Sequence, residues 1–104
     1  MSEEFQRTIE ADLGQISNVA DDFSAWAEAQ GISSHNIFAV NLVLDELISN
    51  VILYGIGEGK PGSIRIDASI EIGANGTQTL ALELRDSAPP FDPFSIPPPN
   101  LTLD

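Results

Sequence analysis

The spacing of hydrophobic positions predicts three strands along this chain. Residues 4–10 place two apolar side chains at strand parity and predict a short first strand. Residues 63–72 alternate strictly between apolar and polar side chains, which is typical of a half-buried strand. A second alternating run over residues 79–85 follows the turn-forming residues 73–76 and predicts an antiparallel hairpin.

Helical spacing between the first and second strands predicts two helices. Asp12 and Gln15 have the spacing of a capping box that begins the first helix, and Gly31 ends it. Its apolar side chains recur every three to four residues. They are Leu13, Ile16, Ala20, Phe23 and Ala27, with Val19 and Trp26 beside them.

The second predicted helix is longer and more apolar. Ser33 and Ser34 are candidate caps for a helix over residues 36–54, which three nearby glycines end. The glycines are Gly55, Gly57 and Gly59. One broad face of this helix carries six aliphatic side chains and is the expected core side. They are Val40, Val43, Leu44, Leu47, Ile48 and Val51.

This order of elements predicts the fold class. Helices on one face of a mostly antiparallel sheet form an α+β two-layer sandwich. The length and the 42% hydrophobic content fit one domain over residues 1–104. Residues 87–104 are rich in proline, which breaks helices and ladders, and predict a loop or an extended tail. Residues 100–104 are too few to form an element alone.

Charge and composition exclude several functions. Sixteen acidic residues against four basic ones give a net charge of −12, which disfavours nucleic acids and anionic membranes and suits a basic protein partner. Cysteine is absent and there is one histidine, so a metal ion would need oxygen ligands. Acidic and amide residues interrupt the longest apolar stretches, and the N-terminus lacks a signal-peptide pattern. We expect a soluble cytoplasmic protein.

Glu46 and Asn50 are the first candidate site residues. They lie four apart, and therefore on one side of the second predicted helix, at the border of its apolar face. Apolar residues flank them, namely Leu42, Val43, Leu47 and Leu53. A carboxylate and an amide in apolar surroundings require a partner such as a cation or a ligand. The alternative is that the pair bonds a neighbouring loop or lies at the solvent edge.

Asp86 is the second candidate. Counting by twos from the inward-facing leucines of the last predicted strand places its carboxylate on the inward face. An ionised carboxylate only accepts hydrogen bonds, so it suits a donor such as the exocyclic amine of adenine. The alternative is an aspartate that merely initiates the turn before the prolines.

Two segments together resemble a known superfamily. Residues 42–55, LVLDELISNVILYG, resemble the N-box helix of the GHKL ATPase/kinase superfamily. Residues 82–93, LELRDSAPPFDP, resemble its first glycine box. The PPFDP ending is most similar to the anti-sigma-factor serine/threonine kinases of bacterial partner-switching systems. The order of elements in that family's single domain is also similar.

The resemblance implies roles for individual residues. Asn50 would coordinate the Mg²⁺ that bridges the ATP phosphates, Glu46 would be the general base, and Asp86 would bind the adenine amine. Three further residues of the box would line the nucleotide site, namely Ala88, Pro90 and Phe91. The implied cofactors are ATP and Mg²⁺. A magnesium ion prefers a few hard oxygen ligands together with phosphate and water, which agrees with an amide oxygen at position 50.

The sequence also departs from the family pattern. Ala88 stands where the first box has glycine, and Leu53 and Tyr54 stand where a basic residue and histidine are frequent. No glycine follows Gly76, so the second glycine box, which opens a phosphate-binding helix in the family, has no counterpart in this sequence. Residues 87–104 correspond to the loop or the start of the ATP lid. We therefore expect weak nucleotide binding.

The resemblance implies a regulatory function. An anti-sigma-factor kinase binds a sigma factor and phosphorylates an anti-sigma-factor antagonist of the STAS type. The alternative is a non-catalytic binding module that keeps this fold and does not turn over ATP. A histidine kinase fragment is a third reading. It is disfavoured because no dimerisation helix with a phosphoacceptor histidine is recognisable, and the one histidine, His35, lies near a helix start. Because an incomplete domain leaves apolar surface uncovered, we also expect a homo-oligomer.

Overall fold

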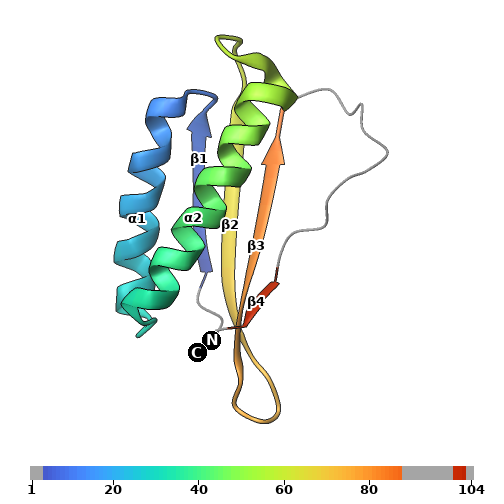
Figure 1. Ribbon diagram of the computed structural model, residues 1–104. Helices are drawn as coiled ribbons and strands as arrows, with labels where there is room; N and C mark the ends of the chain where they lie inside the picture. The colour runs from blue at the N-terminus through green and yellow to red at the C-terminus, as the bar shows by residue number, and fades with distance from the viewer. Residues whose placement is uncertain (1–3, 88–99, 103–104) are drawn as a thin grey trace.

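The computed structural model describes residues 4–87 and 100–102 of the chain. Helices and strands follow one another in the predicted order, with additional short elements at helix ends and near the C-terminus (Figure 1). Their bounds are β1 Glu4–Glu10, η1 Leu13–Gln15, α1 Ile16–Ala29, α2 Ser34–Asn50, η2 Val51–Gly57, β2 Ser63–Ile72, β3 Gln78–Asp86 and β4 Asn100–Thr102.

The strands form one antiparallel sheet in the order β1-β2-β3-β4. β1 pairs with β2 in a register that places Glu4 opposite Ser69. β2 and β3 form the predicted hairpin, whose turn is closed by a hydrogen bond from the Gly73 amide to the Thr77 carbonyl at 2.8 Å. The three strands predicted from alternation are therefore confirmed.

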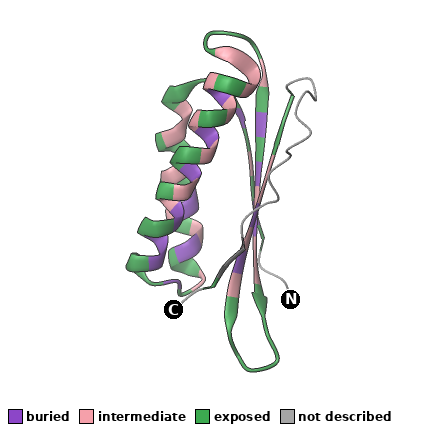
Figure 2. Cartoon of the chain, turned by 45° about the vertical axis from the view of Figure 1, so that its right-hand side comes forward, coloured by how far each residue is buried: buried purple, intermediate pink, exposed green. Residues whose placement is uncertain are grey.

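Both helices cover the same face of the sheet, and the core lies between the two layers (Figure 2). Phe5, Phe23 and Trp26 form an aromatic cluster with ring centroids 5.7 to 5.8 Å apart. The largest fully buried side chains are Phe23, Leu44, Ile48, Ile52, Ile64, Ile66, Leu80, Leu82, Val19 and Val40. Among the described residues, no helix or strand covers the opposite face. The α+β two-layer sandwich is confirmed.

The first helix begins differently from the predicted capping box. The Asp12 carboxylate accepts a hydrogen bond from the Gly14 amide at 3.0 Å and starts a short 3₁₀ turn. Gln15 ends that turn, and its side chain accepts from Asn18 rather than reaching back to Asp12. The reciprocal capping box is therefore wrong, because the 3₁₀ turn moves Gln15 to the N-cap position of α1.

The second helix begins at the predicted cap. The Ser33 hydroxyl accepts a hydrogen bond from the Asn36 amide at 3.2 Å, and the helix runs from Ser34 to Asn50. It then continues as a π-helical segment to Gly57, whose φ of 106° is a left-handed conformation that favours glycine. The helix therefore extends beyond the predicted residues 36–54 at both ends.

α2 and η2 together form a helix of 24 residues that is long and apolar enough, by length and composition alone, to cross a membrane. The core helix of a soluble domain passes the same test. Here Leu44, Ile48 and Ile52 of this helix are fully buried against α1 and the sheet. This packing is consistent with a soluble domain.

β4 lies in the segment 100–104, which was expected to be too short to form an element alone. Asn100–Thr102 pair with β3, with Leu101 opposite Leu80. The segment is short, and it is a strand because β3 supplies the ladder. A pattern within these few residues could not reveal a pairing with a segment some twenty residues earlier.

Candidate functional site

The fold brings the ends of α2 and β3 to the same end of the molecule (Figure 1). The chain leaves α2 through η2 and returns into β2 at Ser63. β3 runs antiparallel to β2, so β3 ends beside the start of β2, with Asp86 opposite Ile64. The two segments that carry Asn50 and Asp86 therefore lie toward the same end of the molecule, although they are far apart in sequence.

The register confirms the inward parity of Asp86. Residues directly opposite each other in an antiparallel pair share one face of the sheet. Ile64, opposite Asp86, is fully buried beneath the helices, so Asp86 belongs to the helix-covered face. Burial decreases along β3 from Leu82 through Leu84 to Asp86, which is exposed. Asp86 therefore lies at the rim of the core, where a ligand can reach it.

Glu46 and Asn50 lie on the side of α2 that points away from α1. Asn41 marks the other side, because its amide donates a hydrogen bond to the Ser24 hydroxyl of α1 at 3.0 Å. Asn50 comes nine residues later, about 180° round the helix from Asn41. Glu46 precedes Asn50 by one turn and shares its side.

Both side chains are exposed, so the expected notch in apolar surroundings is wrong. Of the flanking residues, Val43, Leu47 and Leu53 are half-buried and Leu42 is 56% exposed. The physical reason is that no described element covers this side of α2. The structure agrees with the alternative, a pair at the solvent edge. Because both residues are exposed, neither side chain requires a buried partner.

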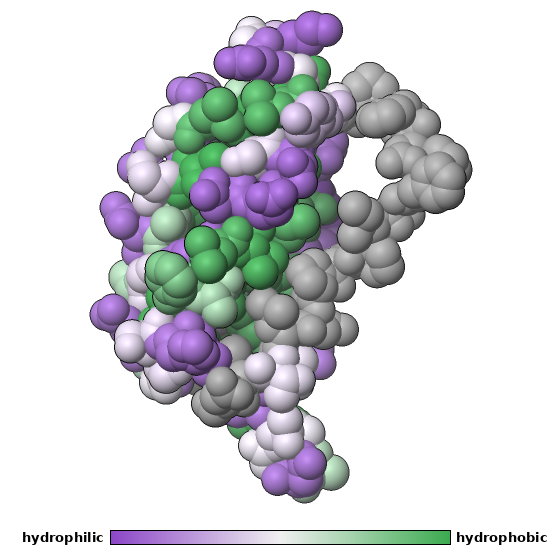
Figure 3. Space-filling view, in the orientation of Figure 1, coloured by the Kyte–Doolittle hydropathy of each residue, from purple (hydrophilic) through white to green (hydrophobic). Residues whose placement is uncertain are grey.

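Hydrophobic side chains gather around this helix on the surface (Figure 3). The exposed large hydrophobic residues of the helix are Phe38 at 66%, Leu42 at 56% and Tyr54 at 76%. Phe38 and Leu42 are one turn apart on the same side, and Leu42 lies one turn before Glu46. The candidate polar pair therefore adjoins an apolar surface rather than an apolar pocket.

Sequence reasoning missed a junction that links the two candidate segments. The Ser63 amide donates to the Ser87 hydroxyl at 2.9 Å, and the Ser87 amide donates to the Ser63 carbonyl at 3.1 Å. A β-carbon on Gly62 would lie 3.0 Å from the Ser87 hydroxyl and 2.9 Å from the terminal methyl of Ile56. The available signal was a glycine directly before a strand, which often marks a close approach.

The remaining predicted site residues, Ala88, Pro90 and Phe91, lie outside the described residues. Within the described part of the chain, no three acidic or histidine side chains form a cluster that could hold a metal ion. A Mg²⁺ ion that arrives with the nucleotide needs few protein ligands, because phosphate and water supply most of its shell. The exposed amide oxygen of Asn50 fits one position in such a shell.

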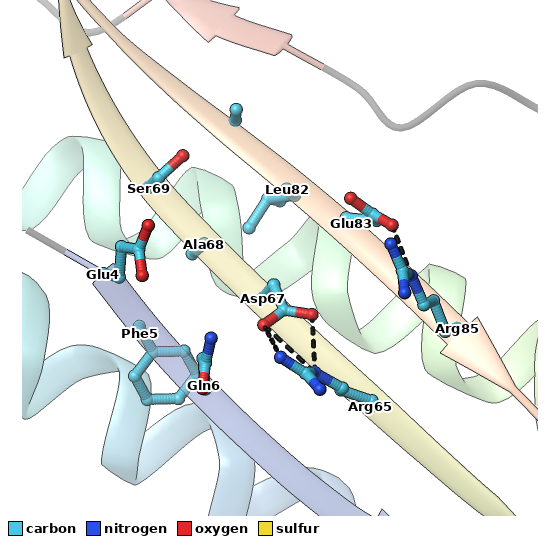
Figure 4. A pocket seen from close by; sticks show the side chains of 11 residues that line it. Glu4, Phe5, Gln6, Arg65, Asp67, Ala68, Ser69, Leu82, Glu83 and Arg85 are labelled. Atoms are coloured by element: carbon cyan, nitrogen blue, oxygen red, sulfur yellow. Dashed lines mark hydrogen bonds and ion pairs between the residues drawn. The ribbon is translucent and has the colours of Figure 1, made fainter. Parts of the chain in front are cut away.

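A separate hollow of about 570 Å³ lies on the face of the sheet opposite the helices (Figure 4). Arg65 and Arg85 lie opposite each other there, and each bonds the acidic residue two positions along its own strand. Arg65 contacts Asp67 at 3.0 Å and Arg85 contacts Glu83 at 2.6 Å. The hydrogen bond to Glu83 raises the pKa of Arg85. None of the predicted site residues lines this hollow.

The structure places two helices on one face of an antiparallel sheet, with an amide and a carboxylate on the second helix and an aspartate at a strand end. The family model described as "Histidine kinase-like ATPase domain" matches residues 9–103. The chain therefore belongs to this family, and membership implies ATP binding, typically with Mg²⁺. No curated protein and no solved structure matches the chain significantly.

Proposed function

We propose that this chain is the ATP-binding domain of an anti-sigma-factor serine/threonine kinase. The observation that carries the proposal is that the two family segments lie toward the same end of the molecule. Asp86 ends a strand on the helix-covered face, and Glu46 and Asn50 lie on the exposed side of the helix that ends near it. The reaction would transfer the γ-phosphoryl group of ATP to a serine of an anti-sigma-factor antagonist.

Each residue has a proposed role that its chemistry allows. Asp86, an acceptor at the rim of the core, binds the exocyclic amine of adenine. Asn50 supplies an oxygen ligand to the Mg²⁺ that arrives with the phosphates, where the ion neutralises developing charge. Glu46 takes the proton from the attacking serine hydroxyl. The proposed contacts of Ala88, Pro90 and Phe91 with the nucleotide complete the site.

The proposed partners are a sigma factor and a STAS-type antagonist in the bacterial cytoplasm. The net charge of −12 supports protein partners with basic surfaces and disfavours nucleic acid and anionic membranes. Transcription would be regulated by exchange between these partners, without contact between this chain and DNA.

A second candidate is a binding module that does not turn over ATP. The observation in its favour is the exposure of Glu46 and Asn50. Electrostatic groups contribute most to phosphoryl transfer in a site that excludes water, because the interactions are stronger at low dielectric. A site open on this side of α2 binds a partner more readily than it positions a γ-phosphate.

Calorimetry with Mg-ATP and Mg-ADP tests the nucleotide site. Asp86→Ala removes the proposed acceptor for adenine, so we expect the variant to lose detectable binding. Asp67→Ala is the matched control, because Asp67 lies on the opposite face of the same sheet. Equal binding by Asp86→Ala and the wild type would show that Asp86 does not recognise adenine.

A further inference from the structure

The end of β3 that carries Asp86 is tied to its neighbours at one point. Ser63 and Ser87 exchange two hydrogen bonds, of 2.9 and 3.1 Å, directly after the Asp86–Ile64 pair. The Gly62 carbonyl accepts a third hydrogen bond from the Ala11 amide at 2.9 Å. The start of β2 is thereby fixed to the end of β1 and to the end of β3.

Gly62 also brings the helical layer into contact with this point. Its backbone has no positive φ, so the glycine is not required by backbone conformation. A β-carbon there would be crowded, 2.9 and 3.1 Å from two atoms of Ile56 and 3.0 Å from the Ser87 hydroxyl, so these side chains would have to shift. Ile56 belongs to η2, which continues directly from Asn50, and it packs against the core.

We propose that Ser87 and Gly62 are positioning residues that set where Asp86 stands relative to Asn50. The Ser87 hydroxyl holds the strand end, and the missing side chain at Gly62 lets η2 approach it. Loss of either contact would retain both site residues in the sequence but change the position of the Asp86 carboxylate. This inference rests on the proposed adenine-binding role of Asp86.

The ratio of ATP affinity to ITP affinity tests this proposal, because a substitution that only destabilised the fold would leave the ratio unchanged. Inosine triphosphate carries a carbonyl where ATP carries the exocyclic amine, so an aspartate that accepts from the amine must prefer ATP. A hydrogen bond to a charged group corresponds to a preference of about tenfold or more. Titrations of the full chain with Mg-ATP and Mg-ITP, followed by backbone amide NMR shifts, measure both dissociation constants even when binding is weak.

We expect the wild type to prefer ATP and Asp86→Asn to lose the preference. Ser87→Ala should reduce the ATP/ITP ratio at least threefold without lowering the melting temperature markedly, and Ser87→Thr, which keeps the hydroxyl, should restore it. Ser17→Ala removes an exposed hydroxyl on α1 and is the control. Gly62→Ala should act as Ser87→Ala does, whereas Gly14→Ala, whose β-carbon has no contact closer than 3.5 Å, should not.

The outcomes separate the inference from the proposed function. A wild type that binds no nucleotide, or that binds ATP and ITP equally, overturns the adenine role of Asp86 and this inference with it. A wild type that prefers ATP, with an unchanged ratio in Ser87→Ala, overturns this inference alone. Hydrogen exchange gives a second measure, because the Ser63 amide should lose protection in Ser87→Ala, and unchanged protection would also contradict the proposal.

Discussion

Asp86 and Asn50 are held to different degrees by their surroundings. Asp86 sits in a sheet ladder, opposite a buried isoleucine, with a hydrogen-bonded pair immediately after it. Asn50 is the last residue of α2, where α-helical bonding changes to π-helical bonding, and its side chain is exposed. Substitution of Asn50 should therefore change ligand binding without a large effect on folding.

Asn50→Ala tests the proposed metal contact. In the wild type, Mg²⁺ should strengthen ATP binding, because the ion joins the phosphates to the Asn50 amide oxygen. In Asn50→Ala this strengthening should be reduced, while binding of metal-free ATP stays unchanged. NMR titrations with and without Mg²⁺ measure the difference, and Asn18→Ala, another exposed helical asparagine, is the control. Wild-type Mg²⁺ dependence in Asn50→Ala would exclude the metal-ligand role.

Periodicity located Glu46, Asn50 and Asp86 on the correct elements and faces, because side-chain direction follows from the helix and strand repeats. It left open whether Glu46 and Asn50 lie in an apolar notch or at the solvent edge. Burial depends on whether another element covers that side of α2, and a helical repeat carries no such information. The contact between Gly62, Ile56 and Ser87 was missed for a similar reason, since it joins three segments that are distant in sequence.

Among the elements, α2 is the one on which the candidate site depends most. It buries four aliphatic side chains, Ile37, Val40, Leu44 and Ile48, while it presents Glu46 and Asn50 on its outer side. Its start was predictable from Ser33, because a capping hydroxyl has a local signature. The change to π-helix after Asn50 was not, since an α-helix and a π-helix share the same apolar pattern over a few residues.

Ser33→Ala should destabilise the domain by about 1 kcal/mol, because the Asn36 amide loses the Ser33 hydroxyl as its hydrogen-bond acceptor. Ser34→Ala is a close control, since Ser34 is the first residue within the helix and caps no described amide. Urea unfolding followed by circular dichroism measures both changes. Equal stability of the two variants would mean that the Ser33 hydroxyl contributes nothing to the start of α2.

At the scale of the whole molecule, the described structure leaves apolar surface beside the site. Phe38 and Leu42 are more than half exposed and lie one turn apart on α2. Exposed apolar patches commonly mark an interaction surface. The proposal of self-association follows from this surface together with the resemblance.

Sedimentation at increasing protein concentration tests self-association. We expect the wild type to associate, and Leu42→Lys to shift the equilibrium toward the monomer, because a charge on the patch would have to be desolvated in the contact. Ile72→Lys is the control, since Ile72 is also more than half exposed but lies at the far end of β2, next to the hairpin turn. A strictly monomeric wild type at high concentration would refute the proposal.

The proposed kinase activity depends on the molecule as a whole. The 104-residue chain should bind ATP weakly and transfer no measurable phosphate, because an open site does not hold the γ-phosphoryl group in line with its acceptor. Positioning can contribute about 7 to 11 kcal/mol to the lowering of a barrier, so a partial loss removes detectable turnover. A form extended through a lid and a second glycine box should phosphorylate the antagonist on serine.

The assay measures transfer of radiolabelled phosphate from Mg-ATP to a STAS-type antagonist. Its arms are the 104-residue chain, the extended form, and the extended form carrying Asn50→Ala or Glu46→Gln. Equal transfer by the short and extended forms would contradict the argument from the open site. Absence of transfer by the extended form would favour the non-catalytic binding module.

The pairing of β1 with β2 has a consequence for the order in which the molecule folds. Glu10 meets Ser63 across a connection that contains both helices, whereas β2 and β3 meet through a short turn. Local contacts form early and distant ones late, because closing a long loop costs more entropy. β1 is synthesised first and should therefore be the last of β1, β2 and β3 to join the sheet. Until β2 has left the ribosome, Phe5 and Ile9 of β1 have no sheet against which to pack.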